Sequence, residues 1–525
     1  MVRAMGVFES AQNNQACFKV IANTKHILYS IFLCGIVSHG MMIFDHWAIH
    51  DDALQLMGEI NSAFTLPLGR WMSFILAIID RYLIFGFPIL LTSTFYGFIA
   101  FISLTVILCI LTRLFRIDNS TELMVLSCYV VTSPMVLMLF GYMHVIPYYF
   151  IGMIVTCIGS YVLCKYNHSV RNFLIAAILL CSGIAVYQAF FPFATSILLV
   201  YLINLTEEQD LSWNSFFKTA FYYVGSCLLA LILYLVSTYI IVLLIRVIRP
   251  SFSLASYKGI DTLGITTFND YIYRIFLAYK NFIIAPFGRG SLDANGAKIF
   301  YFIFFIAGFA SILMKCVDLF KTSNKKTAIQ FFLLIAILPL TINLLYIIIG
   351  EAAGSSMCMI PHFIFVIFIL QRSHFTKSFL KNTILISLIG ISFISARYNN
   401  ICYVKLDVAF TQTKGYFQQL ITRIKSIRSY RDELPVTYIN EFEKQDLSIP
   451  KFKVDTFVHI PPYSFTEAQL INNYAWRQFV RTWCGYDPTA VSNDVFINLP
   501  EVISMPNYPD DGSIKIINDT IIVKF

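Results

Sequence analysis

Two adjacent carboxylates, Asp51 and Asp52, stand out because acidic side chains are scarce in this chain. They close the segment DHWAIHDD, which also contains His46 and His50. A carboxylate beside a hydroxyl group can remove its proton, so one of the pair is a candidate general base. Adjacent residues point in different directions, and we favour Asp52 for this role. The same residues also fit a solvated loop whose acids cap a surface helix over residues 53–60, so both interpretations stay open.

Cationic side chains that suit an anionic ligand lie in two segments. Arg70 belongs to the first segment, residues 45–82. The second segment, residues 249–298, carries four candidates: Lys258, Arg274, Lys280 and Arg289. Cations stabilise the charge that builds on a departing phosphate, so we predict a phosphate or pyrophosphate as their ligand. A compatible alternative is an amphipathic helix over residues 270–284 that lies on anionic headgroups.

Three further polar residues lie where apolar segments begin or end. His144 opens one such segment, and Tyr187 and Gln188 form the short connection between two others. They are candidates for lining a substrate cavity. Amide, phenol and imidazole groups at a membrane interface are also ordinary anchors and turn formers, and for His144 we favour that interpretation. Neither a P-loop nor a dinucleotide fingerprint occurs, so no nucleotide cofactor is expected, and the need for a divalent metal stays open.

Composition indicates which elements position these residues. Of the 525 residues, 58% are apolar and only 13% are charged, too few to cover a soluble body of this size. Apolar runs of about 20 residues, long enough to cross the hydrocarbon core, recur between His26 and Ala396 and then stop. The net charge of +8 comes mostly from short loops between these runs. It therefore indicates membrane topology, and we expect no nucleic-acid partner.

We predict about eleven membrane-spanning helices and a cytoplasmic N-terminus. Lys and Arg fall in alternate short loops, which are cytoplasmic by the positive-inside rule. The two segments of candidate residues and everything after Arg397 are then extracytoplasmic. Apart from His362, the spans are nearly free of ionisable groups, which weighs against an ion-coupled transporter. The predicted spans are residues 26–44, 83–112, 121–140, 144–163, 172–187, 190–205, 219–245, 299–317, 329–350, 358–371 and 382–396.

The chain after the last span predicts a second domain. We divide the protein into a membrane domain of residues 1–396 and a small extracytoplasmic α/β domain of residues 397–525. Apolar periodicity predicts a helix over residues 406–430, and Ser464 with Glu467 forms a capping box for another helix that ends near residue 483. Strands are expected at residues 436–439, 457–460 and 495–499, with a hairpin at Asn518–Asp519. The domain's two cysteines are candidates for a disulfide, and their spacing fits no metal motif: Cys402 and Cys484.

Four short motifs and their order give the chain a resemblance to a known family. They are HDD at residues 50–52, GRW at 69–71, VYQ at 186–188 and MPNYPDDGS at 505–513. With the predicted topology, they resemble the serotype-converting O-antigen glucosyltransferases of temperate phages and enteric bacteria, membrane enzymes of the GT-C type. The resemblance covers nearly the whole chain.

The resemblance implies a reaction at the periplasmic face of the bacterial inner membrane. Glucose would pass from undecaprenyl-phosphate glucose to a sugar hydroxyl of the O-antigen of lipopolysaccharide, by an inverting displacement. Such a displacement needs a base for the acceptor hydroxyl and cations for the lipid phosphate. Two alternatives stay open: another polyprenyl-dependent O-antigen enzyme, such as a polymerase or ligase, and a polytopic transporter.

The topology predicts that the two ends of the chain lie on opposite sides of the membrane. Alkaline phosphatase fused after Phe525 should be active, and green fluorescent protein fused at the same point should be dark, because only the first folds into its active form outside the cytoplasm. The reverse result would overturn both the topology and the extracytoplasmic position of the candidate residues.

Overall fold

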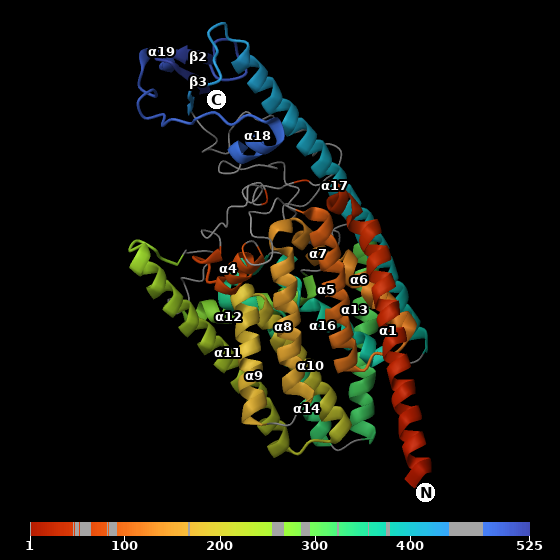
Figure 1. The fold of residues 1–525 in the computed structure, drawn as a ribbon. Coiled ribbons are helices and arrows are strands. Elements are labelled where there is room, and N and C mark those ends of the chain that lie inside the picture. Colours follow the sequence, from red (N-terminus) through yellow and green to blue (C-terminus); the bar gives the residue numbers. More distant parts are fainter. Residues whose placement is uncertain are drawn as a thin grey trace. The chain divides into compact units, whose positions relative to one another are not determined.

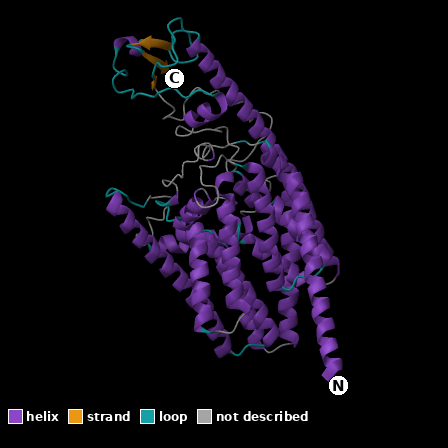
Figure 2. Ribbon diagram, in the orientation of Figure 1, coloured by secondary structure: helices purple, strands orange, loops and turns teal. Residues whose placement is uncertain are grey.

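The computed structural model describes residues 2–45, 47, 52, 65–80, 82, 92–165, 169–254, 267–284, 295–322, 325–354, 356–373, 378–439 and 476–525. Within these ranges the chain is mostly helical, and all strands belong to its C-terminal part (Figures 1 and 2). Contacts divide the chain into two compact units. The first is Met1–Phe44, Ile60–Ile84 and Ser93–Asn400, and the second is Asp45–Glu59, Phe85–Thr92 and Ile401–Phe525.

Long apolar helices form the first unit. Among the described residues, eight helices are long and apolar enough to cross a membrane, two shorter apolar helices accompany them, and one pair of helices forms a bent span. The protein is therefore a multi-pass helical membrane protein. Its helices are α1 (Val2–Phe44), α4 (Trp71–Ile78), α5 (Ser93–Phe115), α6 (Ser120–Thr132), α7 (Pro134–Phe140), α8 (Ile146–Lys165), α9 (Val170–Val186), α10 (Phe190–Gln209), α11 (Trp213–Ile248), α12 (Phe268–Ile284), α13 (Asn295–Thr322), α14 (Lys325–Ile342), α15 (Leu344–Ile349), α16 (His362–Ser373) and α17 (Ser378–Lys425), with 3-10 turns η2 (Met143–Val145), η6 (Gly350–Gly354) and η7 (Ser356–Met359).

The span predicted as one helix over residues 121–140 is broken, so that prediction is wrong in this detail. Helix α6 ends before Ser133, whose backbone is extended, and Pro134 begins α7 at an angle of 47° to α6. The Ser133 side chain accepts a hydrogen bond from the Val136 backbone and so caps α7. Proline lacks the N–H that would continue α6, and it restricts the residue before it to extended conformations.

Side chains from distant helices satisfy the carbonyl groups released at this break. His39 of α1 places Nε2 at 2.8 Å from the carbonyl oxygen of Val131, and Asn399 of α17 donates to the carbonyl of Thr132 at 3.0 Å. Both polar side chains are fully buried. Because hydrocarbon offers no hydrogen bonds, these two contacts allow an irregular backbone within a span.

Helix α12 confirms the amphipathic helix predicted over residues 270–284. Thr267 and Asp270 cap its start reciprocally, since each side chain accepts a hydrogen bond from the other's backbone N–H. The hydrogen bond from the Thr267 hydroxyl lowers the pKa of Asp270. Phe268 and Phe276 are largely exposed while Leu277 is buried, so one apolar face is left for lipid.

The second unit contains a three-stranded sheet. Its central strand β3 (Thr520–Lys524) pairs in parallel with β1 (Val436–Ile439) and antiparallel with β2 (Ile514–Ile517). The predicted strand at 436–439 and the predicted hairpin are confirmed. Asn518 and Asp519 both have positive φ, 51° and 53°, as a two-residue type I′ turn requires. The segment 495–499 forms turns, so the strand predicted there is wrong, and residues 457–460, Ser464 and Glu467 lie outside the described residues.

Aromatic side chains pack this sheet against helices. Short helices α18 (Trp476–Cys484) and α19 (Pro500–Ile503) complete the unit. Trp476 stacks on Phe417 of α17 at 5.6 Å and meets Tyr438 of β1 edge-on at 4.9 Å. The helices predicted separately at 382–396 and 406–430 are both parts of α17, which is continuous. No disulfide joins Cys402, which is buried, to Cys484, which is half-buried, so the pairing left open above is not formed.

A buried ion pair joins α10 to α16 in the first unit. Arg372 donates to Glu207 at 2.5 Å, and their side chains are 2% and 6% exposed. Lys315 of α13 approaches the same carboxylate at 3.8 Å. His362, predicted deep in the tenth span, is instead the first residue of α16 and is buried in the protein. A second ion pair with a buried carboxylate joins Glu122 of α6 to Lys381 of α17 at 2.6 Å.

The neighbouring glutamates 207 and 208 allow a matched test of this ion pair. Glu207→Gln keeps the size of the side chain but leaves Arg372 without its closest counter-charge, which should cost about 3–5 kcal/mol. Glu208→Gln removes only an exposed bridge to Arg116, worth about 0–1 kcal/mol. Thermal unfolding of the detergent-solubilised chain should show a clearly lower midpoint for Glu207→Gln alone. Equal midpoints for the two variants would mean that the buried pair does not hold α16.

Candidate functional site

A tight turn places Arg70 at the start of α4. The N–H groups of Gly69 and Arg70 donate to the carbonyls of Leu66 and Thr65, at 3.0 and 2.9 Å, which is the hydrogen-bond pattern of a Schellman motif. Gly69 has a φ of +70°, which a side chain would strain. A Cβ at this position would also lie 2.5 Å from the Tyr234 hydroxyl. Glycine is therefore required here for two independent reasons.

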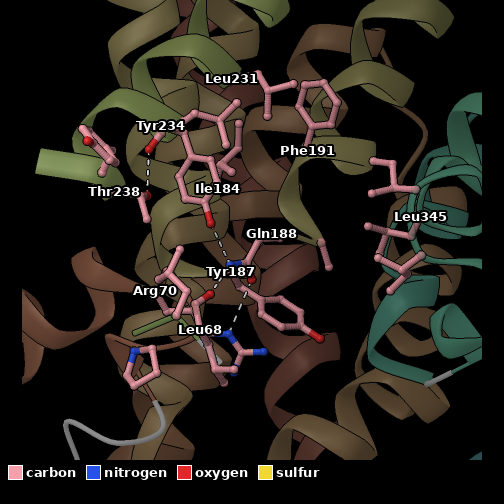
Figure 3. A pocket seen from close by; sticks show the side chains of 18 of the residues that line it. Leu68, Arg70, Ile184, Tyr187, Gln188, Phe191, Leu231, Tyr234, Thr238 and Leu345 are labelled. Carbon is pink, nitrogen blue, oxygen red and sulfur yellow. Dashed lines mark hydrogen bonds between the residues drawn. The ribbon is translucent and has the colours of Figure 1, made fainter. Parts of the chain in front are cut away.

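Gln188 lies between α9 and α10 and joins this turn to helix α11. Its side-chain amide donates to the Leu68 carbonyl at 2.7 Å and to the Tyr234 hydroxyl of α11 at 2.9 Å. Its oxygen accepts from Arg70 Nε at 3.5 Å. Figure 3 shows these contacts meeting at Gln188. The GRW and VYQ motifs, which lie 118 residues apart in the chain, thus form one structure.

Two tyrosines fix the guanidinium group of Arg70. Tyr149 of α8 accepts a hydrogen bond from Nη1 at 3.2 Å, and the guanidinium carbon lies 4.9 Å from the ring centre of Tyr187. The two rings are themselves stacked, 4.9 Å apart with an interplanar angle of 17°. Both tyrosines are buried. Because the rings and the amide of Gln188 hold it, Arg70 is a preorganised cation.

A cavity of about 450 Å³ opens beside Arg70 (Figure 3). Its walls come from the turn at Gly69, from the ends of α9 and α10, from α15, and from one face of α11. The α11 residues that line it recur at helical spacing: Leu231, Tyr234, Leu235, Thr238, Tyr239, Val242 and Arg246. From Leu231 to Arg246 this face extends over roughly 22 Å. The cavity is thus long and mostly apolar, and the charged residues among its described lining are Arg70 and Arg246.

The cavity opens at the side of the first unit. Leu235 and Tyr239 line it and are nevertheless 57% and 63% exposed. Both belong to the apolar helix α11. Exposed apolar side chains on such a helix face lipid in a membrane protein. An apolar chain can therefore enter from the bilayer, while a polar head can reach Arg70. Pockets of this kind typically combine apolar walls with a few placed polar groups.

Arg274 has a different environment from Arg70. Its Nη1 donates to the carbonyls of Ile347 and Ile348, at 3.4 and 2.7 Å, so it caps the end of α15. Lys280 is exposed on α12. Lys258 and Arg289 lie outside the described residues. Of the four cations predicted to bind phosphate in residues 249–298, Arg274 caps a helix and Lys280 lies on the surface.

Two of the remaining predicted residues are described, His144 and Asp52. His144 is in the turn η2, directly before the start of α8. Asp52 is fully buried and belongs to the second unit, together with Trp47, whose ring stacks on Tyr403 of α17. Asp51 lies outside the described residues.

Two residues of the site were missed in the sequence analysis. Arg246 follows a long uncharged run and is the first cation after it, a pattern that marks the end of a span. Its Nε donates to the Phe252 carbonyl at 2.8 Å. Tyr234 gave no signal, since one tyrosine within an apolar helix looks like packing. In the parts of the chain that the structure describes, no group of three or more His, Cys, Asp or Glu side chains is placed to hold a metal ion.

The geometry of the turn predicts the effect of a single methyl group. Gly69→Ala should destabilise the protein by about 1–3 kcal/mol, because alanine is strained at positive φ and its Cβ would clash with Tyr234. Gly40→Ala in α1 is the control, since a Cβ there meets nothing closer than 3.8 Å. Thermal unfolding of the purified full chain should separate the two variants. A Gly69→Ala midpoint as high as that of Gly40→Ala would show that the turn does not need glycine.

Comparisons with known proteins agree with the resemblance drawn from the motifs. The family described as "Glucosyl transferase GtrII" matches residues 40–370, more than half of the chain. This range includes the Arg70 turn, the Tyr187–Gln188 connection and all residues that line the cavity. No curated protein and no solved structure matches the chain. The protein therefore belongs to the GtrII glucosyl transferase family.

Proposed function

We propose that the protein transfers glucose from undecaprenyl-phosphate glucose to the O-antigen of lipopolysaccharide, at the periplasmic face of the bacterial inner membrane. The observation that carries this proposal is the preorganised Arg70 at one end of an apolar cavity that opens to the side of the membrane unit. A lipid-linked donor has this combination of properties, because an isoprenoid chain is joined to an anionic phosphate. Membership of a glucosyl transferase family supplies the chemistry.

The donor would lie with its phosphate at Arg70 and its apolar chain along α11. A guanidinium group binds phosphate oxygens through paired N–H donors, and one Nη of Arg70 is already oriented by Tyr149. Arg246 lines the same cavity and adds a second positive charge. Lys258, Lys280 and Arg289 are proposed to attract the lipid headgroup region, whereas Arg274 holds the backbone of α15.

The proposed topology places the donor site outside the cytoplasm. The proposed eleven crossings are the eight long apolar helices, the bent pair α6 and α7, and the two shorter apolar helices α9 and α16. With a cytoplasmic N-terminus, the start of α8 and the ends of α9 and α11 then face the periplasm. The loop that carries Asp51 and Asp52 follows α1 and faces the same side.

The transfer itself would be an inverting displacement. The carboxylate of Asp52, or of Asp51, removes the proton from an acceptor hydroxyl, whose oxygen forms a bond to the glucose C1. The bond between C1 and the lipid phosphate breaks, and its electron pair stays on the phosphate. Arg70 stabilises the charge that develops there. His144, Tyr187 and Gln188 are proposed to shape the cavity rather than to react.

Linkage analysis of O-antigen tests the function directly. Cells that carry the wild-type chain should gain a side-branch glucose, while Asp52→Asn and Arg70→Gln should each lower its amount about 10²-fold or more at equal membrane levels. Asparagine keeps the size of aspartate but cannot accept the proton.

Arg431→Gln is the control for loss of an arginine, because Arg431 forms only an exposed bridge to Asp519. It should leave glucosylation unchanged. Altered O-antigen chain length without new glucose would instead identify a polymerase, and unaltered O-antigen in wild-type cells would overturn the proposal. Near-normal glucosylation in Asp52→Asn, and in Asp51→Asn as well, would remove both acids from the mechanism.

A further inference from the structure

Asp80, just beyond the end of α4, is a carboxylate that the mechanism above does not use. The hydroxyl of Tyr148 donates to its Oδ2 at 2.9 Å, and the hydroxyl of Tyr96 donates to the same oxygen at 3.3 Å. Both tyrosines are 7% exposed and belong to the first turns of α8 and α5. Two rigid helices therefore fix the position of this carboxylate.

The other oxygen of Asp80 is open. Within the described part of the chain, Oδ1 accepts no hydrogen bond, and no lysine or arginine forms an ion pair with the carboxylate. The side chain is half-buried, so it is accessible from one side. Its described partners are thus neutral hydroxyl donors on one oxygen, which leaves Oδ1 as an acceptor for a ligand. Ligands with hydroxyl groups suit it, since O–H donors to a carboxylate form strong hydrogen bonds.

The first unit places Asp80 near the donor site but not in it. Adjacent residues of α8 hold the two groups, Tyr148 holding Asp80 and Tyr149 holding Arg70. Helix α4 separates Arg70 from Asp80 by about 15 Å along its axis. Asp80 is also absent from the residues that line the cavity. This backbone separation is longer than one sugar ring, so an acceptor of several sugars can extend from the donor site to Asp80.

We infer that Asp80 binds hydroxyl groups of the acceptor saccharide and helps to select it. This inference rests on the proposed function, because it assigns the second substrate of the same reaction. Tyr96 and Tyr148 are positioning residues, which orient the carboxylate so that Oδ1 faces the acceptor. The site takes a neutral, hydroxyl-rich sugar, and the reacting hydroxyl lies elsewhere on the same acceptor.

Steady-state kinetics of the full-length chain in nanodiscs test the inference. The probes are undecaprenyl-phosphate glucose with labelled glucose and purified unmodified O-antigen polysaccharide. Asp80→Asn should raise the KM for the polysaccharide roughly tenfold or more, the loss expected for hydrogen bonds to a charged group. The KM for the donor and the slow transfer of glucose to water without acceptor should stay as in the wild type. Tyr148→Phe, which keeps the charge, should give a smaller increase in the same KM.

Glu351→Gln is the matched control, because Glu351 also accepts a tyrosine hydroxyl, that of Tyr273, at 3.0 Å, but is exposed and lies on η6. It should leave both KM values unchanged.

An unchanged polysaccharide KM in Asp80→Asn, or equal rises in both KM values, would overturn the inference. A collapse of kcat with normal KM values would also overturn it and make Asp80 the base. If Asp80→Asn fails to fold, an unchanged polysaccharide KM in Tyr148→Phe overturns it instead. Absence of transfer by the wild-type chain would overturn the proposed function, a different result.

Discussion

Hydrocarbon offers no hydrogen bonds, so each backbone group released at a helix end or break must find its partner inside the protein. Several polar side chains of the membrane unit form hydrogen bonds with such backbone groups. His39 and Asn399 satisfy the carbonyls at the break between α6 and α7. Ser73 of α4 donates to the Val186 carbonyl at the end of α9. Arg274 does the same for α15. The irregular positions of the membrane unit are thus fixed by specific long-range contacts.

The same constraint shapes the proposed donor site. The turn at Gly69 and the connection at Gln188 are both irregular, and they satisfy each other, since the Gln188 amide donates to the Leu68 carbonyl. Arg70 is held as a consequence of this pairing. A cation that is fixed in advance needs little reorganisation when a phosphate charge develops, which is the main source of electrostatic catalysis. The contacts that satisfy these irregular backbone groups thus also fix the cation of the proposed donor site.

The sequence predicted those features that depend on local pattern. Apolar runs located the helices, the periodicity of residues 270–284 identified α12, and Asn518–Asp519 identified the hairpin. Features that depend on distant partners were not accessible. Nothing local shows that Arg274 faces two backbone carbonyls while Arg70 faces a cavity, because both are arginines in extracytoplasmic loops by the same topology rule. The continuity of α17 was missed because the composition changes along it although the helix does not end.

Two aspartates illustrate how environment separates possible roles. Asp52 is fully buried, and its proposed task is to take the proton of an acceptor hydroxyl. Asp80 is half-buried and fixed by two tyrosine hydroxyls. A carboxylate whose position is set by two donors before the ligand arrives suits the binding of hydroxyl groups. A transferase that must hold an acceptor while activating one of its hydroxyls needs both kinds of carboxylate, and they need not be the same residue.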